Sequence, residues 1–213
     1  MKLFFQYCSY SFNNCYVLGA ERIKSALPSV TQEPCPAIII DPGRMEKNTL
    51  DIIENNNFDL KAVLVTHSHL SHVRGFRTLK RIYDAEVYAV DQTIMGHKTH
   101  MVKDGDKIDI AGFKFEVISI PGHSSDSVVY RIGHLLFTGD VLTAGLVGST
   151  ASAYGAATQM NKLRSRLLSL PGDYIVLPGH GPPSTLEAER RFNTDISHYD
   201  QNRNKKKLFR IDF

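Results

Sequence analysis

The sequence has few cysteines, no long apolar run and no large excess of charge of one sign. The three cysteines, Cys8, Cys15 and Cys35, all lie near the N-terminus of the 213-residue chain. An odd count in a domain of ordinary size argues against a disulfide framework and is typical of a reducing compartment. We therefore expect a cytoplasmic protein, with Cys8 and Cys15 as small buried hydrophobes.

No segment approaches the roughly 20 apolar residues that a membrane-spanning helix needs. The N-terminal sequence MKLFFQYCSYSFNNCYVLGA has a single basic residue before its apolar part, and polar residues interrupt that part repeatedly. A secretory signal peptide would carry an uninterrupted apolar stretch. We expect two short strands here and no membrane association.

The net charge of +3 is too small to predict a nucleic-acid or membrane partner. The end of the chain, 203–213, carries five basic residues and one acidic residue, which leaves a net charge of −1 for the rest. Such a tail is typical of a solvated terminus, with an anion contact as the alternative. We expect one domain over 1–200 and a basic tail over 201–213, with a small molecule as the partner and the oligomeric state open.

Strand-like and helix-like segments are intermixed along the whole chain, with no linker between them. The strands are rich in β-branched and aromatic residues and end at turn residues, whereas the helices show apolar residues at helical spacing. Strands are expected at 2–7, 14–19, 37–40, 60–66, 86–90, 107–110, 113–120, 127–132, 135–137 and 174–177. Helices are expected at 45–53, 73–82 and 157–170, with a last one beginning at Ser184 or Thr185. The pattern predicts an α/β protein with more strands than a simple βαβ repeat.

The segment VLVTHSHLSH places His67, His69 and His72 directly after an apolar strand. Histidine is the commonest metal ligand, and the end of a rigid strand is a good platform for ligands. A lone histidine is usually an ordinary core or surface residue, but three within six residues at a strand end predict a metal site.

Three further candidate ligands also follow predicted strands and have glycine beside them. His123 follows in ISIPGHSS, Asp140 in LLFTGDVLT and His180 in VLPGHGPP. Glycine permits the tight turns that bring such side chains together. The remaining histidines have no comparable context and stay unassigned: His97, His100, His134 and His198.

The order of these motifs resembles the metallo-β-lactamase superfamily, and within it the glyoxalase-II-like hydrolases. The resemblance rests on His-x-His-x-x-His, Pro-Gly-His, Thr-Gly-Asp and Pro-Gly-His-Gly, preceded by Ile-Asp-Pro-Gly at 40–43, and it covers nearly the whole chain. It implies a four-layer αββα sandwich. It also implies two metal positions bridged by Asp140, and a supporting role for Asp41 beside them. The implied ligands are His67, His69 and His123 at the first position, and His72 and His180 at the second.

Ser71 departs from the family motif, which is His-x-His-x-Asp-His. In relatives the aspartate binds the second metal and orients the attacking water. A serine hydroxyl is neutral at pH 7 and a poor ligand, and it leaves Asp140 as the only carboxylate for two divalent ions. We expect the first position to fill readily and the second weakly or not at all, with one or two Zn²⁺, or with Fe²⁺ or Mn²⁺.

Three functions are compatible with these residues. The first is a hydrolase in which metal-bound hydroxide attacks an ester, a thioester, a lactone, a β-lactam or a phosphodiester, with Asp140 and Ser71 as candidate catalytic residues. Only 181–213 follow the last ligand, so a glutathione thioester is not favoured. The second is a mononuclear iron dioxygenase acting on a persulfide, because two histidines and one carboxylate suit Fe²⁺. The third is a degenerate protein that binds metal without turnover.

Overall fold

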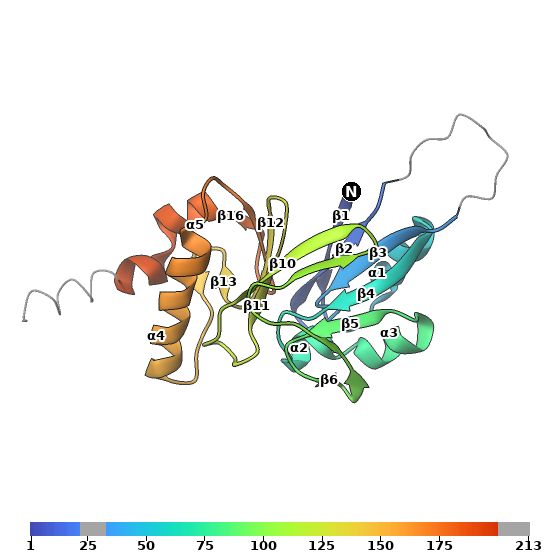
Figure 1. The fold of residues 1–213 in the computed structure, drawn as a ribbon, viewed down its shortest axis with the longest axis horizontal. Helices are drawn as coiled ribbons and strands as arrows, with labels where there is room; N and C mark the ends of the chain where they lie inside the picture. Colours follow the sequence, from blue (N-terminus) through green and yellow to red (C-terminus); the bar gives the residue numbers. More distant parts are fainter. Residues whose placement is uncertain (22–32, 200–213) are drawn as a thin grey trace, which may run out of the picture.

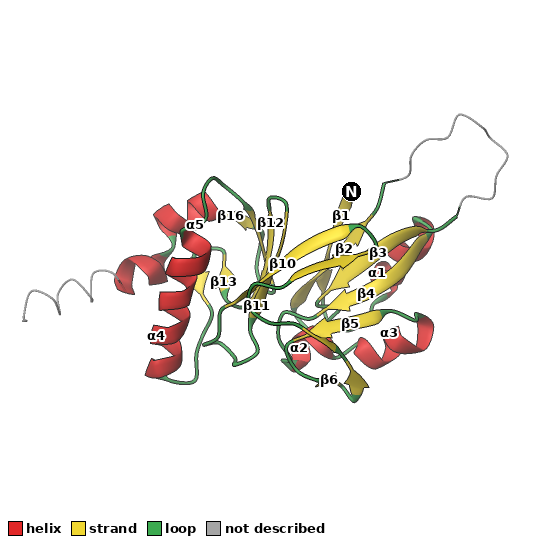
Figure 2. Ribbon diagram, in the orientation of Figure 1, coloured by secondary structure: helices red, strands yellow, loops and turns green. Residues whose placement is uncertain are grey.

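Two six-stranded sheets pack face to face in the computed structural model, which describes residues 1–21 and 33–199 (Figures 1 and 2). The predicted basic tail at 201–213 lies outside the described residues. The first sheet has the order β1 (Lys2–Cys8), β2 (Asn13–Gly19), β3 (Cys35–Ile40), β4 (Phe58–Leu64), β5 (Glu86–Ala89) and β8 (His100–Met101). The second has the order β16 (Ser184–Thr185), β15 (Ile175–Pro178), β12 (Leu135–Gly139), β11 (Val128–Ile132), β10 (Phe113–Ser119) and β9 (Lys107–Ile110).

Helices cover the outer face of each sheet. On the first sheet lie α1 (Lys47–Asn55), α2 (Leu70–Val73) and α3 (Phe76–Ile82), on the right in Figure 1. On the second lie α4 (Ala153–Lys162), a π-helical turn (Leu163–Leu168) and α5 (Leu186–Phe192), on the left. Two small hairpins complete the fold: β6 (Thr93–Ile94) with β7 (His97–Lys98), and β13 (Leu142–Thr143) with β14 (Leu146–Val147). This is the predicted four-layer αββα sandwich.

Successive side chains of the strands point to opposite faces of each sheet, and the buried apolar side chains form three separate layers. In β3, Ile39 packs against the helices of the first sheet, while Ile38 and Ile40 face the second sheet. Side chains of successive strand residues point to opposite faces, so a strand that is apolar on both faces must lie between two layers. In the second sheet, Val129 and Leu136 likewise face α4 and α5. The continuous apolar runs in the sequence are therefore strands buried on both sides.

The strand directions place the candidate ligands at one edge of the sandwich. β3 is parallel to β4, and β12 is parallel to β15. β10 and β12 are both antiparallel to β11, so they run in the same direction. The carboxyl ends of parallel strands meet at one edge of a sheet, where ligands commonly bind in α/β proteins. The loops after these strands carry Asp41, the three-histidine segment, His123, Asp140 and His180.

Several predicted boundaries were wrong in detail. The helix expected at 157–170 begins earlier, at Ala153, because the Ser152 side chain accepts a hydrogen bond from the backbone N–H of Gly155. The helix expected over 73–82 is two short helices, α2 and α3. Of the two candidate caps for the last helix, Thr185 is the one used, because its hydroxyl accepts from the N–H of Ala188.

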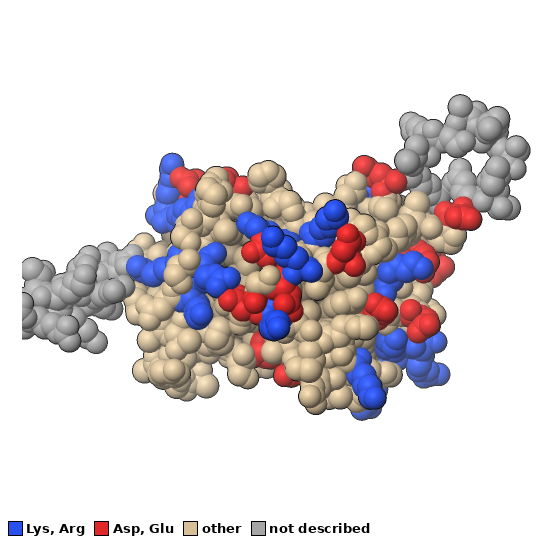
Figure 3. Space-filling view, viewed as in Figure 1, with Lys and Arg blue, Asp and Glu red and all other residues tan. Residues whose placement is uncertain are grey.

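Charged residues of both signs share the surface. On the face shown in Figure 3, Lys and Arg side chains lie among Asp and Glu side chains, and neither sign forms a continuous field. Within residues 1–21 and 33–199, no helix has the length and apolar character needed to cross a bilayer.

Candidate metal centre

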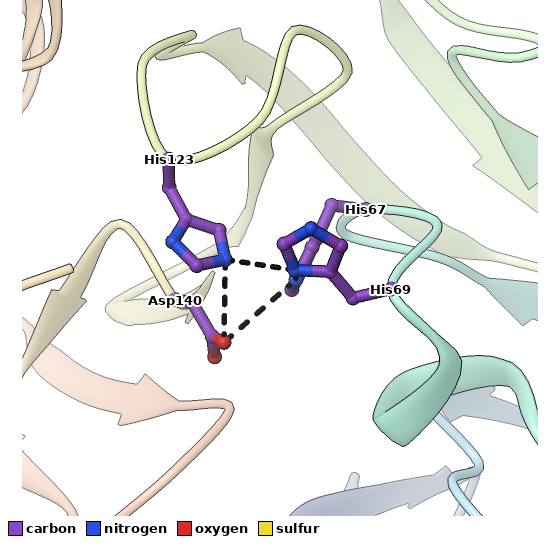
Figure 4. A group of neighbouring side chains, drawn as sticks. All are labelled: His67, His69, His123 and Asp140. Atoms are coloured by element: carbon purple, nitrogen blue, oxygen red, sulfur yellow. Dashed lines mark hydrogen bonds and ion pairs between the residues drawn. The ribbon is translucent and has the colours of Figure 1, made fainter. Parts of the chain in front are cut away.

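Four of the predicted ligands form one compact group. The side chains of His67, His69, His123 and Asp140 point toward a common centre from three loops (Figure 4). Nε2 of His67 and Nε2 of His123 each lie 3.0 Å from Nδ1 of His69. Oδ2 of Asp140 lies 3.7 Å from the His67 Nε2 atom and 3.5 Å from the His123 Nε2 atom. Ligand atoms of a tetrahedral zinc ion, bonded at about 2.0–2.1 Å, are separated by about 3.3 Å, so this spacing fits a metal.

A second group shares Asp140 with the first. It consists of His72, Asp140 and His180, whose ligand atoms lie within 4.8 Å of one another. Nε2 of His72 lies 3.4 Å from Oδ1 of Asp140, and Nε2 of His180 lies 3.5 Å from its Oδ2. The two carboxylate oxygens of Asp140 therefore face both groups, as a bridging residue would.

Backbone carbonyls hold two of the histidine rings from behind. Nδ1 of His123 donates to the carbonyl of Ser149 at 2.8 Å, and Nδ1 of His180 donates to the carbonyl of Phe12 at 2.6 Å. Because a carbonyl only accepts, each Nδ1 carries a proton and each Nε2 offers its lone pair to a metal. The tautomer of both rings is thus set by the fold.

The side chains of Asp41 and Thr66 hold the Nδ1 atoms of two further histidine rings, those of His72 and His67. Nδ1 of His72 lies 2.9 Å from Oδ2 of Asp41, and the Thr66 hydroxyl donates to that same oxygen at 2.6 Å. The only hydroxyl proton of Thr66 is used there, so its oxygen accepts from Nδ1 of His67 at 3.1 Å. The Nε2 atoms of His67 and His72 are therefore both left for a metal.

Burial and neighbouring charge divide the histidines electrostatically. Burial lowers the pKa of His67 to about 3, with a further lowering from the charge of His72. Burial also lowers the pKa of His69. For His72, burial alone favours the neutral ring, but Asp41 and Asp140 outweigh it and raise its pKa to about 10. Burial raises the pKa of Asp140, yet His72, His67 and His180 more than offset it, so this carboxyl is ionised at neutral pH.

Two buried atoms indicate that the second group is also built for an ion. Nε2 of His72 and Oδ1 of Asp140 have no hydrogen-bond partner among the described residues, although both are buried. Buried polar atoms are nearly always partnered, and a metal would satisfy both. Gly179 leaves the space open, since a Cβ there would overlap Oδ1 of Asp140 and Cε1 of His72.

The remaining predicted residues are placed differently. Ser71 is half-buried and lies in α2, directly before His72. Three of the unassigned histidines pack against aromatic rings elsewhere: His97 on Phe76, His100 on Tyr88 and His134 on Tyr174. None of these three belongs to either histidine–aspartate group found among the described residues.

The family model of the metallo-beta-lactamase superfamily matches residues 36–180 of the chain. This range is more than half of the sequence and contains every candidate ligand. The protein belongs to the metallo-β-lactamase superfamily. The αββα sandwich is the fold predicted from the resemblance, and the structure brings the candidate ligands together in two adjoining groups.

Curated relatives of this metallo-β-lactamase superfamily member include hydrolases. An uncharacterised protein of Mycobacterium tuberculosis strain H37Rv is 31% identical, over 84% of this chain and 91% of its own. A hydroxyacylglutathione hydrolase of Chromohalobacter salexigens is 35% identical, over 67% of this chain and 56% of its own. The hydroxyacylglutathione hydrolase GloC of Haemophilus influenzae is 30% identical, over 74% of this chain and 85% of its own. Together with the metal-binding groups, these relatives identify the protein as a metallo-hydrolase.

Solved structures of the same fold include proteins of different names. ETHE1 from Myxococcus xanthus has a TM-score of 0.79 and 26% identity, over 93% of this chain and 85% of its own. TTHA1623, solved in a di-iron-bound form, has a TM-score of 0.71 and 26% identity, over 90% of this chain and 99% of its own. BLEG-1, a B3 metallo-beta-lactamase, has a TM-score of 0.77 over 92% and 100%, and at 24% identity it shows the fold alone.

Sequence reasoning missed the groups that hold the ligands from behind. The backbone carbonyls of Phe12 and Ser149 could not be predicted from residue type, because every residue carries a carbonyl. Two side chains were missed as well: Thr66, which directly precedes the first histidine, and Asp126, which accepts the backbone N–H of Ser68 and follows His123 by three residues. Short spacing to a ligand was the only signal that could have drawn attention to these two.

Proposed function

We propose that the protein is a metal-dependent hydrolase that cleaves an ester, a thioester or a related bond of a small molecule. The observation that carries the proposal is the convergence of five histidines and Asp140 into two adjoining groups. In four of these rings an acceptor holds Nδ1, so Nε2 is presented inward before any ion arrives. Preorganisation of this kind is typical of a functional metal site rather than of chance clustering.

His67, His69 and His123 would hold an ion at the first position, with Asp140 between it and the second. When bound, a Zn²⁺ ion there would supply a water with a pKa of about 7 and would polarise the bond to be cleaved. Asp140 is ionised at neutral pH, so it can accept a hydrogen bond from the attacking water and orient it. The hydroxyl of Ser71 can donate to the same water or to the substrate, but it cannot act as a base at neutral pH.

Ser71 makes the second position the weaker of the two. With one carboxylate and two imidazoles, this position lacks the charge that an aspartate at 71 would supply. Asp41 is buried close by, but its oxygens already accept from Thr66 and His72. Asp41 therefore supports the ligands and does not replace the missing carboxylate. We propose about one tightly bound ion per chain and a second that dissociates readily.

The first substrate class to test is a hydroxyacylglutathione thioester. Two relatives with that name are 30% and 35% identical to this chain, and the match spans 85% of the shorter one. Other thioesters, lactones and esters belong in the same screen.

The decisive experiment combines metal analysis with anaerobic assays. Protein purified without added metal should contain about one Zn²⁺ per chain and should hydrolyse thioesters without O₂. His67→Ala should lose both the metal and the activity, whereas His134→Ala, which changes a histidine outside the site, should lose neither. A His67→Ala variant with unchanged metal content would show that the ligand assignment is wrong.

Iron chemistry is the second candidate, favoured by the similarity to ETHE1 and to a di-iron-bound neighbour. Two histidines and Asp140 can form the facial arrangement that suits mononuclear Fe²⁺ and O₂. In that case the purified protein would contain iron, consume O₂ in the presence of a persulfide and show no thioesterase activity under anaerobic conditions.

A further inference from the structure

The three histidines of the first metal position lie on two loops that belong to different sheets. His67 and His69 lie on the loop after β4 in the first sheet, and His123 lies on the loop after β10 in the second. The 3.0 Å separation between Nδ1 of His69 and Nε2 of His123 depends on the relative placement of these loops. Productive metal geometry requires ligand placement within about 0.5 Å, so something must hold the loops in register.

Asp126 connects the two loops through a hydrogen bond from its side chain to the backbone. It lies three residues after His123, and its Oδ2 accepts the backbone N–H of Ser68 at 2.7 Å. Ser68 is the residue between His67 and His69, so the bond reaches the short segment that carries both ligands. A backbone bond from the N–H of Val128 to the carbonyl of Thr66, at 2.9 Å, runs beside it.

The environment of Asp126 favours a charged, well-ordered acceptor. Its side chain is only 7% exposed, although Ser68 itself lies at the surface. Burial raises the pKa of Asp126, but hydrogen bonds from Ser124 and Ser68 outweigh it, and the net shift is downward. Hydrogen bonds to an ionised acceptor are shorter and stronger than neutral ones. The negative charge also lies near His69, where it favours a cation at the first position.

We propose that Asp126 is a positioning residue of the metal centre. It binds no metal itself and contacts no ligand ring; it holds the N–H of Ser68 and thereby sets the distance between His69 and His123. The proposal rests on the proposed function only in that a metal occupies the first position. Its test needs no substrate, so a failure of the hydrolase assignment would leave it standing.

The test compares variants of Asp126 with a control variant, with Zn²⁺ and Co²⁺ as the probe ions. Asp126→Ala should weaken binding of the first Zn²⁺ by about 10- to 100-fold in a chelator competition. It should also change the ligand-field spectrum of the Co²⁺-loaded protein, because the coordination geometry relaxes. Asp126→Asn keeps an oxygen that accepts from Ser68, so it should recover the wild-type spectrum and most of the affinity.

Asp195→Ala is the matched control. The Asp195 carboxylate also accepts one backbone N–H, that of Val147 at 2.8 Å, but on a hairpin that carries no ligand. This variant should lower the melting temperature without changing Zn²⁺ affinity or the Co²⁺ spectrum. Wild-type affinity and spectrum in Asp126→Ala, or equal losses in Asp126→Ala and Asp195→Ala, would overturn the proposal.

A folding failure of Asp126→Ala would not end the test. Asp126→Glu keeps the charge but moves the acceptor oxygen by one methylene, so the contact with Ser68 must shift. The same weakening of the first Zn²⁺ and the same spectral change are expected. Unchanged binding and spectrum in a folded Asp126→Glu protein would also contradict a positioning role.

Discussion

Asp41 holds His72 from the side of the ring that faces away from the metal centre. Its Oδ2 lies 2.9 Å from Nδ1 of His72, and both side chains are buried. Asp41 adopts a φ of +48°, a left-handed conformation that residues other than glycine rarely take. Such conformations are retained where the surrounding structure imposes them, often at functional sites. Here the turn delivers a carboxylate to the back of one ligand and, through Thr66, to the back of another.

Asp41→Asn should weaken metal binding at both positions by about 10- to 100-fold. The aspartate accepts from the N–H of Thr66, the hydroxyl of Thr66 and Nδ1 of His72. An asparagine has only one acceptor oxygen, so at least one donor loses its partner. Chelator competition measures the effect, and Asp51→Asn, which alters a surface ion pair with Lys47, should leave it unchanged.

Ser71→Asp should raise the metal content from about one ion per chain toward two. The added carboxylate supplies a ligand and a negative charge at the position that the family motif assigns to aspartate. Elemental analysis after dialysis against a weak chelator gives the stoichiometry. Unchanged stoichiometry in a folded Ser71→Asp protein would mean that Ser71 does not limit the second position. Ser71→Asn, which adds a side chain of similar size without the charge, serves as the control.

Gly179→Ala should abolish the second ion and keep the first. The new methyl group would overlap Oδ1 of Asp140 and Cε1 of His72, which together border the second position. The comparison is made in the Ser71→Asp background, where two ions are expected. Gly181→Ala is the control, because its methyl group meets no atom within 4 Å even though its φ of +79° makes the substitution strained. Retention of two ions in Gly179→Ala would place the second position elsewhere.

His72 should be charged and His67 neutral in the metal-free protein at pH 8. The pKa of His72 is raised to about 10 and that of His67 is lowered to about 3. The charged His72 ring stabilises the metal-free fold below its unfolded pKa of about 6.5, and this contribution is lost as the pH rises toward 10. ¹⁵N NMR of the imidazole groups distinguishes the two states, and joint titration of both rings near pH 6.5 would contradict the prediction.

The same charge makes filling of the second position dependent on pH. An ion at Nε2 of His72 must displace a proton, whereas His67 has none to lose at neutral pH. The apparent affinity of the second position should therefore rise about tenfold per pH unit between pH 7 and 9 in Ser71→Asp, with a smaller rise at the first position. Metal titrations at three pH values measure this difference.

The residue pattern alone was sufficient to propose the six candidate ligands that the structure brings together. Three histidines after an apolar strand, and single ligands after three further strands, are local signals that survive without any knowledge of packing. The strands themselves were predictable because alternation and β-branched residues are also local. Helix boundaries were less predictable. With Ser152 as its cap, α4 begins at Ala153, four residues before the expected start, because one side-chain hydrogen bond decides where a helix begins.

Tertiary structure decided how the ligands are used. The sequence determined which side chains can bind a metal, because imidazole and carboxylate chemistry belongs to the residue. The division into two groups around Asp140, the tautomer of each ring and the opposite pKa shifts of His67 and His72 depend on atoms far apart in the chain. The carbonyl of Phe12 meets His180, and Asp126 meets Ser68, only because two sheets pack with their carboxyl edges together. Contacts between distant residues require closure of the whole sandwich, and no local pattern encodes them.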